Sequence, residues 1–277
     1  MNLSVVIITF NEEANIGRTL ESLKPLVADG KGEIIVVDSG STDRTVEIAK
    51  SYGAKVFVEE WKGYAAQKNS AIDKATGDWI LSLDADEEIS DGMRDLLLLI
   101  VLGKHESGYA GIGMVFARKN HFLGREIKHG GFYPDEKLRL FWHGLGRFEE
   151  RAVHEDIRMI EGCEIYNPSW HYVMKSPIEI IHHSYPTLSD YIEHMNRYSS
   201  LGAEMVVAEG GVGFSVINIV VRPMFTFIYN YFFRLGFLDG REGLLLHLYH
   251  AVYVSWKYAK AWELSRKREV NLPGSHP

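Results

Sequence analysis

Four short runs of β-branched and apolar residues recur in the first hundred residues, and a segment of helical character follows each run. The runs cover residues 3–10, 33–38, 55–58 and 79–83, and the helical patterns cover residues 13–23, 43–52, 64–74 and 91–102. Strands that are apolar on both faces are typical of parallel sheets covered by helices. The alternating order therefore predicts an α/β fold, an open and doubly wound sheet with helices on both faces.

The pattern changes after Gly103. We expect strands at residues 109–118 and 137–141, separated by the Gly130-Gly131 turn, and a helical, increasingly apolar chain from about Ser176 onward. The sequence thus divides into residues 1–103 and 104–175, the two halves of one domain, and a C-terminal helical region, residues 176–277. Open α/β sheets bind ligands beyond the carboxyl ends of their strands, and polar residues follow the first, second and fourth runs here.

The charge distribution separates an acidic body from a basic, apolar tail. The 277 residues are 46% apolar with a formal net charge of −7, yet residues 214–277 contain eight Lys and Arg against four Asp and Glu. An acidic body disfavours nucleic acid as a partner, whereas a basic apolar tail suits an anionic lipid surface. The single cysteine, Cys163, excludes an internal disulfide. The first residues lack the basic segment of a secretory signal, so we expect none.

Three apolar stretches in the tail are candidates for membrane contact. They cover residues 210–221, 223–233 and 243–256, and each is shorter than the about 20 residues that span a bilayer. As helices they carry aromatic residues flanked by Arg and Lys, which is typical of helices that lie in a membrane surface. We expect a peripheral membrane protein. The alternative is a helical subdomain packed on the rest of the chain or on a second subunit of a homo-oligomer.

Asp84-Ala85-Asp86 directly follows the fourth strand. Two carboxylates one residue apart can hold a hard divalent cation, Mg²⁺ or Mn²⁺, which in turn binds phosphate oxygens. The alternative is that Asp86 or Ser90 only caps the next helix. A calcium loop of the EF-hand type is excluded, because it needs glycine where this chain has Ile89.

Asp38 ends the second strand and opens a turn that runs to Asp43. Its carboxylate can accept hydrogen bonds from a nucleobase or a ribose. The next helix N-terminus, capped by Ser41, Thr42 or Asp43, favours an anionic ligand. A plain strand-turn-helix connection explains everything except Asp38. Dinucleotide and P-loop enzymes are disfavoured, because the chain has no Gly-x-Gly-x-x-Gly after its first strand and no Gly-x-x-x-x-Gly-Lys-Ser/Thr.

Four segments in fixed order resemble a known family. Residues 5–13, 36–43, 67–69 and 77–86 together are similar to the family 2 glycosyltransferases of GT-A fold. The resemblance implies a Rossmann-like, mostly parallel sheet, with residues 1–103 as the nucleotide-sugar-binding half and residues 104–175 as the acceptor half. The implied site consists of the nucleotide-binding residues Thr9, Glu12, Asp38, Lys68 and Asp84 and of the metal ligand Asp86 in an Asp-x-Asp (DXD) motif. The first three would hold the nucleoside, Lys68 would lie near the base or diphosphate, and Asp84 would face the ribose or the sugar.

A second set of motifs resembles a subgroup of that family. Tyr133-Pro134-Asp135, Arg139-Leu140-Phe141 and Val153-His154-Glu155 are similar to segments of lipopolysaccharide-core β-1,4-glucosyltransferases. An inverting transfer needs one base to deprotonate the attacking hydroxyl. The His-Glu pattern assigns this role to Glu155, with the adjacent Asp156 as the alternative, and His154 is a second metal ligand or a packed histidine. A zinc protease is excluded, because Arg158 stands where His-Glu-x-x-His requires histidine.

The resemblance therefore implies an inverting, metal-dependent hexosyltransferase. We expect glucose from UDP-glucose as the transferred sugar and a lipid-linked saccharide, such as the lipopolysaccharide inner core, as the acceptor. We expect a cytoplasmic protein, peripheral on the cytoplasmic face of the inner membrane. A sugar nucleotidyltransferase is disfavoured, because its first loop is glycine-rich and basic, whereas residues 11–13 here are Asn-Glu-Glu. The third alternative is a non-catalytic, membrane-associated nucleotide-sugar-binding protein, against which the complete set of acidic residues argues.

Overall fold

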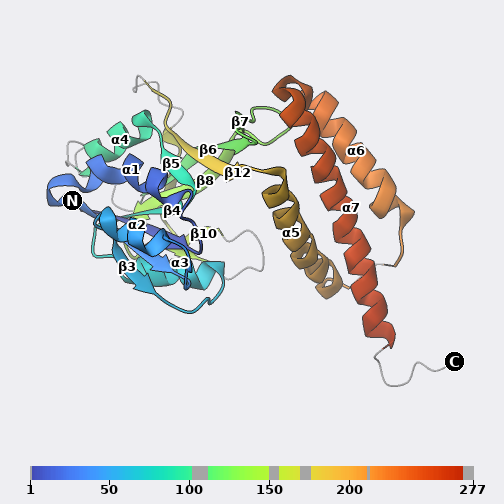
Figure 1. The fold of residues 1–277 in the computed structure, drawn as a ribbon, viewed down its shortest axis with the longest axis horizontal. Coiled ribbons are helices and arrows are strands. Elements are labelled where there is room, and N and C mark those ends of the chain that lie inside the picture. The colour runs from blue at the N-terminus through green and yellow to red at the C-terminus, as the bar shows by residue number, and fades with distance from the viewer. Residues whose placement is uncertain (1, 102–111, 150–155, 169–175, 211–212, 271–277) are drawn as a thin grey trace. The chain divides into compact units, whose positions relative to one another are not determined.

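The computed structural model describes residues 2–101, 112–149, 156–168, 176–210 and 213–270. The chain forms two compact units (Figure 1). Unit 1 contains residues 1–119 and 134–183, and unit 2 contains residues 120–133 and 184–277. The chain therefore passes from one unit to the other at residues 120, 134 and 184.

The first hundred residues alternate strand and helix, as predicted. The strands are β1 (Leu3–Thr9), β2 (Gly32–Asp38), β3 (Lys55–Val58), β4 (Trp79–Asp84) and β5 (Glu87–Ile89). The helices are α1 (Ile16–Val27), the 3₁₀ turn η1 (Ala28–Gly30), α2 (Thr45–Ser51), α3 (Tyr64–Asp73) and α4 (Asp91–Val101). Helix α1 begins later than the pattern predicts, because the side chains of Thr45, the first residue of α2, and of Asp43 accept hydrogen bonds from the N–H groups of Glu12 and Glu13.

The second half of unit 1 consists of strands. They are β6 (Ile112–Phe122), β7 (Arg125–Glu126), β8 (Asp135–Trp142), β9 (Gly146–Phe148), β10 (Ile157–Met159), β11 (Glu164–Tyr166) and β12 (Glu179–Tyr185), of which β7 and the ends of β6 and β12 belong to unit 2. The strands predicted at residues 109–118 and 137–141 are β6 and β8. The helical chain starts at Leu188 rather than at residue 176, because residues 179–185 form β12.

One sheet of ten strands has the order β3-β2-β1-β4-β8-β6-β12-β5, with β7 and β11 paired to β6. Strands β3, β2, β1 and β4 pair in parallel. Strand β8 is antiparallel to both β4 and β6. The predicted doubly wound, parallel arrangement therefore holds for β1 to β4, whereas β5 pairs antiparallel with β12 and the later strands extend the same sheet in mixed directions.

Alternate residues of β1 face two different helical layers. Leu3, Val5 and Ile7 are buried in one core cluster with side chains of α1, α2 and α4. Val6 is buried in a second cluster with side chains of α3. Successive side chains of a strand point to opposite faces of its sheet, so helices cover both faces of β1, as the apolar runs predict.

Unit 2 is mainly helical. Its segments are α5 (Leu188–Ala208), the π-helical η3 (Ile217–Val221), α6 (Arg222–Ile228), the π-helical η4 (Tyr229–Phe233), the 3₁₀ turn η5 (Gly236–Asp239) and α7 (Gly240–Val270). Helix α5 starts with a capping box, in which Thr187 and Asp190 each accept a hydrogen bond from the other's N–H group. Among the described residues, no helix combines the length and the apolar character needed to cross a bilayer.

Candidate functional site

Three loops at one edge of the parallel strands carry most of the residues that the sequence singles out. The register of the sheet places Thr9 of β1 opposite Asp38 of β2, and Ile8 of β1 opposite Asp84 of β4. Because the chain leaves these parallel strands at the same edge, the loops that follow them meet there. Lys68 of α3 joins them through a salt bridge, with Nζ 2.9 Å from Oδ1 of Asp84.

Asp38 organises the loops after β1 and β2. Its carboxylate is fully buried and accepts hydrogen bonds from the hydroxyls of Thr9 and Ser41 and from the N–H groups of Gly40 and Ser41. A carboxylate has about four acceptor positions, so these bonds use its full capacity. The Ser41 hydroxyl also accepts a hydrogen bond from the N–H of Asn11, at 2.8 Å. Asp38 therefore ties the loops after β1 and β2 together.

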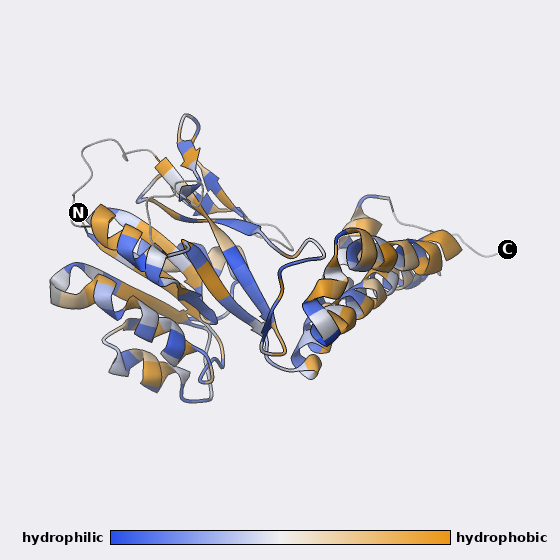
Figure 2. Ribbon diagram, turned by 90° about the horizontal axis from the view of Figure 1, so that it is seen from above, coloured by the Kyte–Doolittle hydropathy of each residue, from blue (hydrophilic) through white to orange (hydrophobic). Residues whose placement is uncertain are grey.

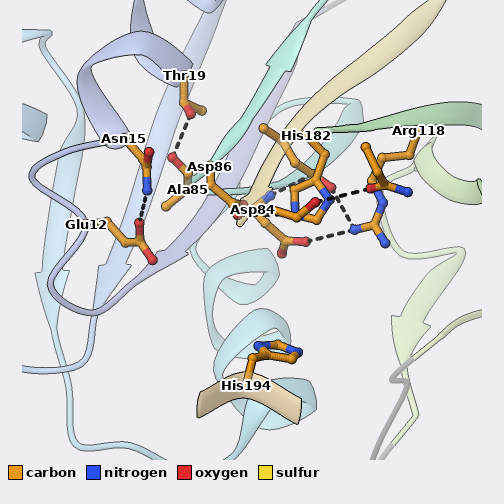
Figure 3. A network of polar contacts seen from close by, with 12 residues as sticks. Glu12, Asn15, Thr19, Asp84, Ala85, Asp86, Arg118, His182 and His194 are labelled. Carbon is orange, nitrogen blue, oxygen red and sulfur yellow. Dashed lines mark hydrogen bonds and ion pairs between the residues drawn. The ribbon is translucent and has the colours of Figure 1, made fainter. Parts of the chain in front are cut away.

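Glu12 lies on the acidic side of the same edge (Figure 3). Its Oε2 accepts a hydrogen bond of 2.9 Å from the side chain of Asn15. Burial raises the pKa of Glu12, the hydrogen bond from Asn15 opposes this, and the negative charges of Asp86, Asp43 and Asp84 raise the pKa further. Carboxylates that repel one another in this way produce a negative potential, which attracts a cation.

Asp84 lies between two cations. Lys68 contacts Oδ1, and Nη2 of Arg139 donates a hydrogen bond of 2.9 Å to Oδ2. Burial opposes ionisation, but the two cations outweigh it and hold the pKa of Asp84 well below its usual range. Arg139 also donates to Oε1 of Glu87 at 2.6 Å, and Oε2 of Glu87 accepts the N–H of Asp84 at 3.0 Å. Asp84 is thus fixed through both its side chain and its backbone.

Two motifs of the second half complete this network. Arg118 donates two hydrogen bonds to Oδ2 of Asp135, at 2.8 and 2.6 Å, and one to Glu87 at 3.2 Å. Arg118 and Arg139 therefore neutralise the fully buried Glu87 between them. The Pro-Asp and Arg-Leu-Phe motifs, which the sequence linked only to a subgroup, supply two members of the network that supports Asp84.

Asp86 contacts a histidine that the sequence did not assign to the site. Nε2 of His182, on β12, lies 3.2 Å from Oδ2 of Asp86 (Figure 3). Burial raises the pKa of Asp86, but the positive charge and the hydrogen bond of His182 outweigh it, so the pKa is lowered. The backbone also holds this loop, because the carbonyl of Ala85 accepts a hydrogen bond from Thr19 and that of Asp86 accepts the N–H of His183. The only sequence signal for this contact was that His182 and His183 are adjacent, a spacing that can bind a metal.

A divalent cation fits this loop if the substrate supplies part of its coordination. Among the described residues, no group of three or more His, Cys, Asp and Glu side chains could hold a metal ion. Asp86 offers an oxygen ligand and His182 a nitrogen ligand. The carboxylate of Asp84 is already paired with the side chains of Lys68 and Arg139. Mg²⁺ in phosphate-binding sites takes only one or two protein carboxylates and completes its shell with phosphate and water. The donor set therefore suits a cation bound together with a diphosphate.

The predicted base Glu155 and the predicted second metal ligand His154 lie outside the described residues. Asp156 is described and is exposed directly before β10, the second strand of the β9–β10 hairpin, where its carbonyl accepts the N–H of Glu149 at 3.1 Å. Phe148, the last residue of β9, is tied to α3 by two hydrogen bonds with the side chain of Asn69. Its ring lies 5.1 Å from Nζ of Lys68. The hairpin strand that leads toward Glu155 is therefore anchored beside Lys68.

Two further residues near this edge were not assigned from the sequence. Phe10 directly follows β1, and its side chain is 57% exposed. Gln67 precedes Lys68 on α3 and is fully buried, yet neither of its amide atoms has a hydrogen-bond partner among the described residues. A buried amide without partners is costly, which makes Gln67 a candidate for contact with a bound ligand. Their positions inside the quoted motifs were the only sequence signal.

Comparisons with known proteins identify a family over residues 4–155 and relatives over nearly the whole chain. The model of the family "Glycosyl transferase family 2" matches residues 4–155. An uncharacterized glycosyltransferase of Rickettsia bellii is 32% identical and aligns with 98% of this chain and 87% of its own. The lipopolysaccharide core biosynthesis glycosyltransferase LpsC of Rhizobium meliloti is 29% identical over 94% of this chain and 92% of its own.

A solved structure of S. aureus TarS, residues 1–349, aligns with 97% of this chain and 92% of that chain. The sequence identity is 18% and the TM-score is 0.46, a level of similarity from which neither ligand nor activity transfers. The family match and the relatives suffice without it. They confirm the resemblance read from residues 5–86, the GT-A architecture that it implied and the enzyme class. This chain belongs to glycosyltransferase family 2.

Proposed function

We propose that this chain transfers a hexose, in the first instance glucose from UDP-glucose, to a lipid-linked saccharide such as the inner core of lipopolysaccharide. The observation that carries the proposal is the edge where Asp86 meets His182 and Asp84 meets Lys68, within a family 2 glycosyltransferase. The similarity to a relative named for lipopolysaccharide core biosynthesis supports the acceptor class. Such an acceptor would keep the enzyme peripheral on the cytoplasmic face of the inner membrane.

The donor would bind along the loops after β1, β2 and β4. The exposed ring of Phe10 suits stacking on a nucleobase, an interaction worth about 1–3 kcal/mol in other proteins. Thr9, Glu12 and Asp38 would hold the nucleoside. Lys68 would lie near the diphosphate, and Asp84 would face the ribose or the sugar.

The reaction needs a base on the acceptor side. A carboxylate, Glu155 in this proposal, takes the proton of the acceptor hydroxyl as its oxygen bonds to the anomeric carbon. The bond from that carbon to the diphosphate oxygen breaks on the opposite face, so the configuration inverts. Asp86 and His182 would hold a divalent cation, Mg²⁺ or Mn²⁺, whose charge stabilises the departing diphosphate.

Calorimetric titration with UDP, GDP and CMP, with and without Mn²⁺ or Mg²⁺, tests the donor and metal assignments. We expect UDP to bind in a cation-dependent way. Asp86→Asn should abolish the cation dependence, whereas the control Asp73→Asn, at an exposed pair with Arg147, should bind like the wild type. Binding that chelator leaves unchanged would refute the metal assignment, and no binding to any nucleotide by the folded protein would refute the function.

The base is tested by pairing transfer with donor binding. Glu155→Gln should lower the transfer rate by about 10²–10⁴-fold, which is the usual contribution of a general base, and leave the affinity for UDP unchanged. Asp156→Asn should retain most of the activity. The reverse result, with normal turnover by Glu155→Gln, would remove Glu155 from the mechanism and assign the base to Asp156.

A further inference from the structure

One line of apolar side chains runs along the exposed side of the helical segment Ile217–Phe233, which comprises η3, α6 and η4. Every fourth residue belongs to it: Ile217, Val221, Phe225, Tyr229 and Phe233. We call this set the apolar stripe. Its members are between 46% and 74% exposed, and further exposed apolar side chains flank it: Val216, Val220, Met224, Ile228, Phe232, Leu235, Phe237 and Leu238. In Figure 2, large parts of the helices near the C-terminus are orange, the colour of hydrophobic residues.

The alternation of α- and π-helical turns keeps the apolar stripe straight. An α-helix completes a turn in about 3.6 residues, so side chains four residues apart drift steadily around it. A π-helical turn, with hydrogen bonds between residues i and i+5, takes up more residues and drifts the other way. The order π, α, π in η3, α6 and η4 therefore cancels the drift. The rings of Phe225, Tyr229 and Phe233 stack successively, with centroids 6.1 and 6.3 Å apart.

The other side of the same segment packs on α7 within unit 2. Ser255 donates a hydrogen bond of 2.7 Å to the carbonyl of Ile219, and the ring of Tyr231 meets that of His247. Arg222 donates a hydrogen bond to the hydroxyl of Tyr258. The segment is thus fixed by its polar and aromatic contacts with α7, and its remaining side presents the apolar stripe. Apolar patches of this kind mark interaction sites in soluble proteins.

The charged residues within the segment that carries the apolar stripe are all positive. No acidic residue occurs between Glu209 and Asp239, whereas Arg222 directly follows Val221 of the stripe and Arg234 directly follows Phe233 at its end. The guanidinium of Arg234 lies 5.9 Å from the ring of Tyr229. Asp239 is buried and bonds to His129, so it does not contribute an exposed negative charge. Arg with exposed aromatic side chains is the composition of helices that lie in an anionic lipid surface.

We propose that the apolar stripe of residues 217–233 inserts into the interfacial layer of an anionic lipid bilayer, with Arg222 and Arg234 at the lipid phosphates. Phe, Tyr and Val side chains would enter the layer between headgroups and acyl chains, and α7 would stay above it. The segment is too short to span, so it lies parallel to the surface. The surface is the one that a lipid-linked acceptor would occupy under the proposed function, yet vesicle binding can be measured without any transfer.

Flotation of the full chain with vesicles tests this proposal. The vesicles contain phosphatidylcholine alone or phosphatidylcholine with phosphatidylglycerol. We expect binding to the anionic vesicles, which rising salt weakens. The double variant Phe225→Ser with Phe233→Ser should lose at least about tenfold in partition. The matched control is Ile165→Ser on β11, a 62% exposed apolar side chain in unit 1, which should bind like the wild type.

UDP titration of the same variants separates the two proposals. If the double variant loses vesicle binding but keeps its affinity for UDP, the result supports lipid insertion of the stripe. If the protein binds vesicles but not UDP, the proposed transferase function fails and the proposal for the stripe stands. If the double variant does not fold, Phe233→Trp with quenching by brominated lipids replaces it, and this variant should be quenched more strongly than the wild type with its six tryptophans. Equal vesicle binding by wild type and double variant would overturn the proposal. The proposal would also be overturned if the wild type formed a dimer that does not bind vesicles and the double variant were a monomer. The stripe would then be the interface between two copies of the chain.

Discussion

The network around Asp84 and the apolar stripe are opposite departures from ordinary protein packing. In the network, charged groups are buried: Glu87 and Arg139 are almost inaccessible to water. In the stripe, phenylalanine and isoleucine side chains are exposed. Burying charge and exposing large apolar groups both oppose stability. A buried charge or an exposed apolar patch therefore says more about function than an exposed charge or a buried apolar group does.

The two regions differ in how the departure is compensated. The buried charges compensate one another within unit 1, because Arg139 and Arg118 hold Glu87 while Lys68 and Arg139 hold Asp84. Among the described residues, the side chains of the stripe are between 46% and 74% exposed and have no comparable compensation. The network should therefore be sensitive to any change in its own members. Substitutions in the stripe should barely change the free energy of unfolding. They should weaken only the binding to the proposed lipid surface.

Arg139→Met gives the largest expected effect, because it leaves Glu87 buried beside one cation instead of two. We expect the free energy of unfolding to fall by about 3–5 kcal/mol, the range for breaking a buried pair from one side. Urea denaturation measures it. The control is Arg147→Met, whose pair with Asp73 is exposed and should cost less than about 1 kcal/mol. Similar losses in the two variants would mean that the network is not internally compensated.

Gly130→Ala probes the packing of unit 2 behind the stripe. Gly130 has a φ of +69°, and an added Cβ would lie 1.9 Å from Cε1 of the buried His247. We expect a loss of about 2–4 kcal/mol from the clash and the strained backbone together. Gly144→Ala separates the two causes, because Gly144 also has a positive φ but nothing lies within 4 Å of its added Cβ. Equal losses in thermal unfolding would exclude the clash.

Glu33→Gln tests whether a charge network away from the candidate site behaves in the same way. Partial burial opposes ionisation, but hydrogen bonds from Lys55, Ser4 and Thr76 outweigh it and lower the pKa of Glu33 to about 2. A lowered pKa stabilises the fold fully above the unfolded value of 4.5, and the contribution disappears as the pH falls from 4.5 through 2. The variant should thus lose about 2 kcal/mol at pH 7 and much less near pH 3.

The pH series for Glu33 has a direct control in Glu47→Gln. Glu47 is paired with Arg44 on the surface, with both side chains well exposed. The Glu47→Gln variant should unfold like the wild type at every pH. A pH-independent loss in Glu33→Gln would mean that the side chain contributes packing rather than charge.

Phe233→Ser should give the smallest effect on stability. Its side chain is 74% exposed, so without lipid we expect the free energy of unfolding to stay within about 0.5 kcal/mol of the wild type. Leu246→Ala, at a buried position of the same unit, should cost about 2–5 kcal/mol. A large loss for Phe233→Ser in lipid-free urea denaturation would make the stripe part of the fold and would remove the contrast with the network.

The sequence predicted the local elements well, because their signals are local. The β-branched runs indicated β1 to β4, and Asp84-Ala85-Asp86 indicated the loop after β4. The partners of that loop could not be predicted in the same way. Arg139 reaches Asp84 only because β8 pairs with β4, and His182 reaches Asp86 from a strand nearly a hundred positions later. The apolar stretches were evident, but the straight stripe depends on π-helical turns that no periodicity of 3.6 residues indicates.

The passage of the chain between the units at residues 120, 134 and 184 affects how it can fold as it leaves the ribosome. Residues 120–133 emerge long before the helices that complete their unit. Phe122 and Ile127 must wait for Tyr191 and Leu246 to be synthesised before their common core can close. A nascent chain or a fragment that stops at residue 183 would therefore expose these apolar side chains, which makes such a species prone to aggregation.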